Sequence, residues 1–322
     1  MVFTRKIKKD NTENYFVSFK QQAQHFYLNN KIKKIKSQKP IYNIFFNENE
    51  FIDNISELNS NGFTIIRNFF DKKILKNISD KTDKFISNGQ KLEGVRDNLR
   101  ELRENKKFFE RIWLNNEQIK EMSKTKLRNT TNGISIKDPL INNSEIIKVI
   151  SSIKFIKLLF AYYECIPELT YIKIRKAFAN KLPANDTQFF HRDSGSFKLL
   201  KAVIYLNDVD INTGPFTFVK GSTRKFDFPK HKLRFKDHEI ASHYGKSNIK
   251  HLTAKRGDLV LANTTGFHKG LKPKLKDRNV CIANFCVHDE LGFSYDKIKI
   301  KKNKYNDLNH IQKHIFKNLV KV

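Results

Sequence analysis

Cysteine is scarce in this sequence. The chain has only three, Cys165, Cys281 and Cys286, and none of them forms a CxxC motif. An odd count without that spacing excludes a closed disulfide framework and argues against a structural zinc site. Hydrophobic residues make up 39% of the 322 positions, which is enough to bury a core without cross-links. We therefore expect a chain that folds in a reducing compartment, and we predict a cytoplasmic location.

Long apolar segments are lacking as well. The longest, residues 153–163, is interrupted by Lys154 and Lys157, and it is far shorter than the roughly 20 residues that span a bilayer. The start of the chain is basic but has no apolar stretch of the length that a secretory signal needs. The sequence predicts no membrane span and no export.

Acidic residues are few beside basic ones. The chain has 33 Asp and Glu against 62 Lys and Arg, a formal net charge of +29, and such an excess attracts phosphates over long range. The basic residues are mostly lysines spread along the chain, however, whereas phosphate recognition favours the planar fork of arginine. We interpret the charge as a solvated basic surface. A nucleic-acid partner is thereby disfavoured, while an acidic small-molecule substrate remains compatible.

The pattern of helices and strands divides the chain. We expect a basic N-terminal extension over residues 1–45 and one domain over 46–322, with helical support at 46–165, a strand-rich core at 166–290 and a basic C-terminal tail at 291–322. Helices are predicted at 72–88, 99–124 and 144–163. Strands are predicted within 61–70 and at 171–178, 187–193, 201–208, 215–221, 257–263 and 279–287. This order indicates an α+β fold, a jelly roll with flanking helices from the N-terminal half.

A candidate metal site begins at His191-Arg192-Asp193. On a strand, residues i and i+2 point to the same side, so His191 and Asp193 can face one ion while Arg192 points away. A site of two histidines and one carboxylate needs a second histidine from elsewhere and leaves positions open for co-substrates. His268, just after the strand predicted at 257–263, is the best candidate.

Other histidines offer weaker patterns. His288 and Glu290 form another HxE pair, but no later strand follows to supply a third ligand. His310 and His314 have the spacing of a helical metal pair, yet Ile311 stands where a metalloprotease needs its glutamate. We interpret these as structural or surface histidines.

Arg278 follows His268 by ten residues and opens the strand predicted at 279–287. A hairpin return would bring its guanidinium back beside the metal, where a planar fork can grip a carboxylate with two hydrogen bonds. The alternative is a surface arginine in the charged turn KLKDR.

Taken together, these segments resemble the phytanoyl-CoA dioxygenase-like family of iron(II) and 2-oxoglutarate-dependent oxygenases. The resemblance covers residues 62–287, from the opening GFTIIRNFFDKKIL through HRDSGSFKLLKAVIYLND to GDLVLANTTGFH. It implies a double-stranded β-helix, iron ligands at His191, Asp193 and His268, and 2-oxoglutarate bound by Arg278, with O2 as the other co-substrate. Lys173 is a further candidate for the same carboxylate. No catalytic residue is expected beyond the metal centre.

Departures from the family affect the substrate assignment and leave the set of metal ligands whole. The usual PGSH segment is Lys220-Gly221-Ser222-Thr223 here, and Gly270 replaces a small hydroxyl residue. The intact Asp193 disfavours the halogenating branch, and Asn284 replaces the second arginine of the nucleic-acid dealkylating branch. We predict hydroxylation of a small-molecule or lipid/acyl-type substrate. The alternatives are a non-catalytic basic jelly roll that binds nucleic acid or other anions, and a cupin-like metal enzyme without 2-oxoglutarate.

Overall fold

The computed structural model describes residues 50–88, 92–97, 111–114, 128–129, 131–193, 198–224, 232–287, 298–317 and 319–322. The predicted extension, residues 1–45, lies outside these ranges, and the proposed domain boundaries stay a prediction. None of the helices in the described part of the chain is long and apolar enough to cross a membrane.

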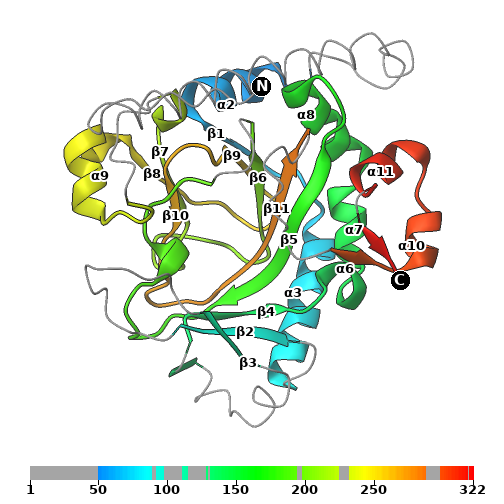
Figure 1. The fold of residues 1–322 in the computed structure, drawn as a ribbon, viewed down its shortest axis with the longest axis horizontal. Coiled ribbons are helices and arrows are strands. Elements are labelled where there is room, and N and C mark those ends of the chain that lie inside the picture. Colours follow the sequence, from blue (N-terminus) through cyan, green and yellow to red (C-terminus); the bar gives the residue numbers. More distant parts are fainter. Residues whose placement is uncertain are drawn as a thin grey trace, which may run out of the picture.

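A large sheet of eight strands is the main element of the fold (Figure 1). All of its pairings are antiparallel. In spatial order the strands are β1 (Phe63–Ile66), β9 (Leu259–Asn263), β6 (Leu200–Tyr205), β11 (Arg278–Cys286), β5 (Glu168–Ala177), β4 (Gly133–Ile136), β2 (Leu92–Asp97) and β3 (Arg111–Leu114). The long strands β5, β6 and β11 lie side by side in its middle.

A smaller antiparallel sheet closes the other side of the barrel. Its order is β10 (His268–Gly270), β7 (Phe216–Val219) and β8 (Ile249–Leu252). An inner core fills the space between the sheets and joins side chains such as Val203, Tyr205 and Val280 of the large sheet to Phe216 and Phe218 of the small one. The two packed sheets confirm the predicted jelly roll with flanking helices.

Helices cover the outer face of the large sheet (Figure 1). They are α2 (Ile52–Asn61), α3 (Lys72–Ser87), α6 (Pro139–Asn142), α7 (Glu145–Ile150) and α8 (Ile153–Tyr163), while α9 (Asp237–Tyr244) lies beside the small sheet. Asp71 begins α3 by accepting hydrogen bonds from the backbone N–H groups of Lys73 and Ile74, as its position before the apolar pattern predicts. These helices form an outer core with the side chains that the strands turn away from the barrel.

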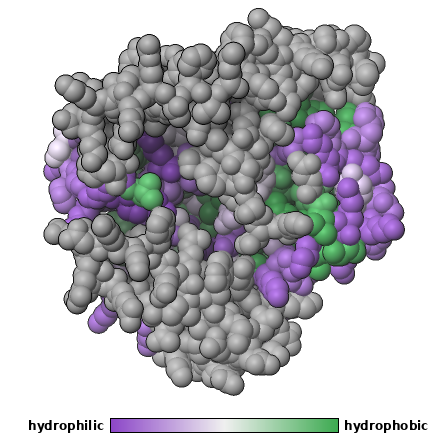
Figure 2. All heavy atoms as spheres, in the orientation of Figure 1, coloured by the Kyte–Doolittle hydropathy of each residue, from purple (hydrophilic) through white to green (hydrophobic). Residues whose placement is uncertain are grey.

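Residues 298–317 and 319–322, within the segment expected to be a basic tail, pack against this outer core. They form β12 (Lys299–Ile300), α10 (Lys302–Asn306), α11 (His310–Ile315) and β13 (Val320–Lys321). Ile300, Ile315 and Phe316 are fully buried there. Hydrophilic residues nevertheless dominate the described surface at the two sides of the molecule, as Figure 2 shows.

Two sequence-based expectations were wrong in detail. Residues 111–114 form strand β3 where a helix over 99–124 was predicted, and most of the remainder of that range lies outside the described residues. Residues 187–193 are no regular strand: a 3-10 turn spans Asp186–Gln188, and isolated bridges tie Phe190 to Phe235 and His191 to His268. Both segments are short, so tertiary contacts outweigh their β or helical propensity.

Candidate metal and co-substrate site

His191, in a loop, and His268, the first residue of β10, form a backbone pair. The N–H of His191 donates to the carbonyl of His268 at 3.0 Å, and the N–H of His268 donates back at 2.9 Å. Asp193 is held two residues further on, where its N–H donates to the carbonyl of Thr264 at 2.9 Å. The backbone thus brings three predicted ligands from distant parts of the chain to one place.

The hydrogen bonds of the two imidazoles fix their tautomers. Nδ1 of His191 lies 2.9 Å from the carbonyl oxygen of Phe189, and Nδ1 of His268 lies 3.0 Å from that of Gly266. A carbonyl can only accept, so each Nδ1 carries the proton and each Nε2 keeps a lone pair. Both Nε2 atoms face Asp193: His191 Nε2 is 3.7 Å from Oδ1 and His268 Nε2 is 3.5 Å from Oδ2.

This donor set fits a divalent metal. The three candidate ligand atoms lie within 4.8 Å of one another, and both histidines are buried. Two neutral imidazole nitrogens and one carboxylate oxygen from three positions are the donors of a facial triad, in which the opposite side stays open. The carbonyls that accept from Nδ1 supply the outer support such ligands usually have.

The protonation states suit metal binding too. Burial lowers the pKa of His191 to about 4 and that of His268 well below its ordinary value. Burial alone would raise the pKa of the Asp193 carboxyl, but the ammonium of Lys201, followed by His268 and His191, holds it well below its usual range. At neutral pH the group therefore consists of two neutral histidines and one carboxylate.

Lys201 is part of this site and was missed by the sequence analysis. Its Nζ lies 2.7 Å from Asp193 Oδ2 and 3.2 Å from His268 Nε2. On β6 it lies on the same face as Val203 and Tyr205, every second residue of the strand, and these two belong to the inner core. That alternation was the available signal, because a lysine in phase with inward apolar residues must face the barrel interior.

Arg278 also points into the barrel. It shares the inner face of β11 with Val280, is 8% exposed, and donates through Nη1 to the carbonyl of Leu271 at 3.1 Å. No carboxylate of the described residues pairs with it. Burial, and to a lesser degree the nearby Arg175, lowers its pKa to about 10. A buried guanidinium without an acidic partner is a ready receptor for a ligand carboxylate.

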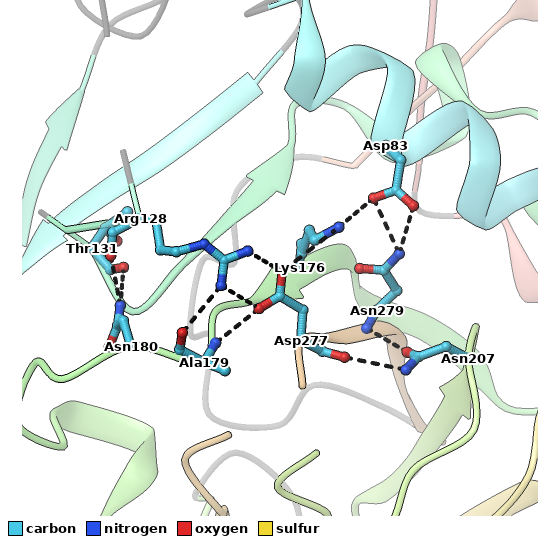
Figure 3. Close-up of polar contacts among 9 residues, drawn as sticks. All are labelled: Asp83, Arg128, Thr131, Lys176, Ala179, Asn180, Asn207, Asp277 and Asn279. Atoms are coloured by element: carbon cyan, nitrogen blue, oxygen red, sulfur yellow. Dashed lines mark hydrogen bonds and ion pairs between the residues drawn. The ribbon is translucent and has the colours of Figure 1, made fainter. Parts of the chain in front are cut away.

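A polar network on the outer face fixes the start of β11 (Figure 3). Asp277 accepts a two-pronged bond from Arg128, with both distances 2.7 Å, and a third from the N–H of Ala179 at 2.9 Å. Asn279 donates to Asp83 of α3 at 3.2 Å, and Lys176 binds the same carboxylate at 2.7 Å. Because both neighbours of Arg278 are anchored outward, the strand's alternation turns Arg278 inward.

Gly270 lies directly against this guanidinium. A Cβ at position 270 would stand 3.3 Å from Nη2 of Arg278. The position at which relatives carry a small hydroxyl residue is therefore beside the predicted co-substrate arginine.

The structure also places the other residues singled out from the sequence, some in the barrel interior and some away from the triad. Lys173 pairs in register with Ile282 and so faces the barrel interior, and its part in holding 2-oxoglutarate stays a prediction. Arg192 points away as expected: its guanidinium lies 4.3 Å from the ring of Phe267. His310 and His314 lie on α11, away from the triad, and His288 lies outside the described residues.

Comparisons with known proteins agree with this geometry. The sequence model of the phytanoyl-CoA dioxygenase (PhyH) family matches residues 58–272, a range that includes the triad and ends six residues before Arg278. No curated protein matches the chain.

Two solved structures share the fold. One is the non-heme alpha ketoglutarate dependent epimerase SnoN from nogalamycin biosynthesis, at 12% identity and a TM-score of 0.52, covering 76% of this chain and 87% of that one. The other is AviO1 from Streptomyces viridochromogenes Tue57, at 10% identity and a TM-score of 0.50, covering 74% and 95%. With more than half of its length matched by the family model and a candidate ligand set in the barrel, the chain belongs to the phytanoyl-CoA dioxygenase family, whose enzymes depend on iron and 2-oxoglutarate.

Proposed function

We propose that this protein is a hydroxylase in which His191, Asp193 and His268 hold iron(II) and Arg278 holds 2-oxoglutarate. One observation carries the proposal: two neutral histidines and a carboxylate converge within 4.8 Å in the same barrel interior as a buried arginine that has no acidic partner among the described residues. The first group suits a metal with open positions, and the second suits a dianionic co-substrate.

Each residue has a defined task. The Nε2 atoms of His191 and His268 and one oxygen of Asp193 would hold the metal on one side. Arg278 would fix the distal carboxylate of 2-oxoglutarate and so orient its keto acid end toward that metal. When bound, iron(II) with 2-oxoglutarate and O2 supplies the oxidation of a substrate C–H group to an alcohol, with release of succinate and carbon dioxide.

A small molecule is the proposed substrate. The basic composition is compatible with one that has an acidic group, lipid or acyl type included. SnoN, which shares the fold, is an epimerase from nogalamycin biosynthesis, so the fold supports more than one reaction and does not choose the substrate. A cytoplasmic location belongs to the same proposal, since all three cysteines are free and buried.

Anaerobic titration tests the assignment. Purified protein is titrated with iron(II) and then with 2-oxoglutarate while the weak visible charge-transfer band of the chelate is followed. The band should form in the wild type, disappear in His191→Ala, and persist in His238→Ala, which removes an exposed histidine of α9. Succinate release then serves to screen substrates.

Other outcomes would point elsewhere. Folded, metal-loaded protein that gives no band would favour a metal enzyme without 2-oxoglutarate. A band of equal strength in His191→Ala would refute the ligand assignment.

A further inference from the structure

Lys201 occupies an unusual place for a lysine. Its side chain is 12% exposed, and its Nζ contacts two of the three proposed ligands, at 2.7 Å from Asp193 Oδ2 and 3.2 Å from His268 Nε2. Asp193 is the carboxylate that pairs with this ammonium among the described residues. The positive charge that balances Asp193 in the metal-free protein is therefore a side chain of the protein itself.

A metal ion and this ammonium would compete for the same two atoms. Asp193 Oδ2 and His268 Nε2 are 3.5 Å apart, and a divalent metal binds such atoms at about 2.0–2.2 Å. A metal that contacts both would lie close to Nζ, and the two positive charges would repel each other strongly in a buried site. Metal binding through Asp193 Oδ2 therefore favours a position of Lys201 further from this oxygen.

The strand register offers Lys201 a second partner. Asn284 of β11 lies directly opposite Lys201 of β6, and such cross-strand pairs have Cβ atoms about 4.5–5.5 Å apart. Asn284 is 5% exposed, and its Oδ1 has no hydrogen-bond partner among the described residues. The neighbour of Lys201 on the other side is Ala262, which has a small side chain.

We propose that Lys201 is a displaceable internal cation of the metal site. In the metal-free protein it neutralises Asp193, and when a divalent metal binds it turns to Oδ1 of Asn284. This inference rests on the proposed function, because it takes Asp193 and His268 as metal ligands. It makes Lys201 a positioning residue that preserves the empty site and lowers the affinity for metal, and it gives Asn284 the role of receiving the displaced ammonium.

Calorimetric titration of the full chain with nickel(II), an air-stable probe, tests the inference without any turnover. Lys201→Met should bind nickel at least about tenfold more tightly, because the competing charge is gone. Asn284→Leu should bind about tenfold more weakly, because the displaced ammonium loses its acceptor. In the Lys201→Met background, Asn284→Leu should change nothing, which is the coupling that a double-mutant cycle detects. Lys250→Met, at an exposed residue of β8, is the matched control.

Two results of the same titrations would overturn the inference. Equal or weaker nickel affinity in folded Lys201→Met would overturn the inference, and so would an Asn284→Leu effect that persists without Lys201. If Lys201→Met does not fold, Lys201→Gln provides the same comparison with a neutral polar chain. Failure of the proposed function looks different: nickel would not bind to the wild type at all, or would bind equally well to His191→Ala.

Discussion

Replacement of Arg278 by methionine separates a binding role from a structural one. The buried guanidinium has a pKa lowered from 12.5 to about 10, which corresponds to a cost of about 3 kcal/mol for keeping the charge in the folded state. The hydrogen bond to the carbonyl of Leu271 returns about 1 kcal/mol. Met fills a similar volume without charge. The metal-free variant should therefore be as stable as the wild type or more stable by up to about 2 kcal/mol.

Binding of 2-oxoglutarate should change in the opposite direction. Loss of one partner of a buried, hydrogen-bonded charge pair costs about 2–5 kcal/mol, and about 1.4 kcal/mol corresponds to a factor of ten. The Kd for 2-oxoglutarate should rise roughly 30- to 3000-fold, with the affinity for metal unchanged.

Two measurements decide between a binding role and a structural role of Arg278. Denaturant unfolding of the metal-free protein gives the stability, and anaerobic titration of the iron-loaded protein gives the Kd. Arg67→Met is the control, since Arg67 is 58% exposed and its partner, the buried Asp258, keeps hydrogen bonds from the backbone N–H groups of Asn68 and Lys255. A variant of Arg278 that loses several kcal/mol of stability yet keeps its affinity for 2-oxoglutarate would show that the arginine supports the fold and that the reasoning is wrong.

Three further predictions concern the same site. Gly270→Ser should lower the Kd for 2-oxoglutarate several-fold in the same titration, because its hydroxyl would lie beside Arg278 and add a hydrogen bond worth about 1 kcal/mol; weaker binding would mean that the space is already filled. The folded-state pKa of His191, about 4, lies below the unfolded value of 6.5, so the unfolded chain binds more protons between these values. Unfolding measured across pH should show the metal-free protein losing up to about 3 kcal/mol as the pH falls from 6.5 to 4, and this part of the slope should vanish in His191→Gln. Asp277→Asn should cost about 1 kcal/mol in denaturant unfolding, since its pair with Arg128 is half-exposed and screened. The same variant should weaken 2-oxoglutarate binding while nickel affinity stays constant; unchanged 2-oxoglutarate affinity would show that Arg278 keeps its place without the network.

The sequence was sufficient to predict the positions of those site residues that follow directly from the order of the strands along the chain. The chain returns to one rim of the barrel, and there His191, Asp193 and His268 meet. Arg278 reaches the interior because it is the first residue of β11, the strand that pairs with β5 and β6. Their chemical roles remain proposals. The domain boundaries likewise stay predictions.

Other features depended on contacts that a local pattern does not contain. β10 has three residues, too few to show a period, and residues 187–193 take their position from bridges to Phe235 and His268. Asn279 is anchored by Asp83, 196 residues away along the chain. Lys201 was visible in principle through the alternation of β6, but a lysine between apolar neighbours suggests a solvent-facing position unless the strand is known to face a polar site.

The reciprocal backbone bonds between His191 and His268 also bear on which metal the protein takes up. A peptide pair of this kind has little freedom to spread or contract, so the backbone positions that carry the two imidazoles stay the same for ions of different size. Manganese, cobalt, nickel and zinc would all be offered the same two imidazole nitrogens. Their affinities would follow the general order of divalent ions, in which iron ranks below nickel and zinc. Correct loading in a cell would then depend on which ions are available when the chain folds, and recombinant protein should retain whichever strong competitor the growth medium supplies.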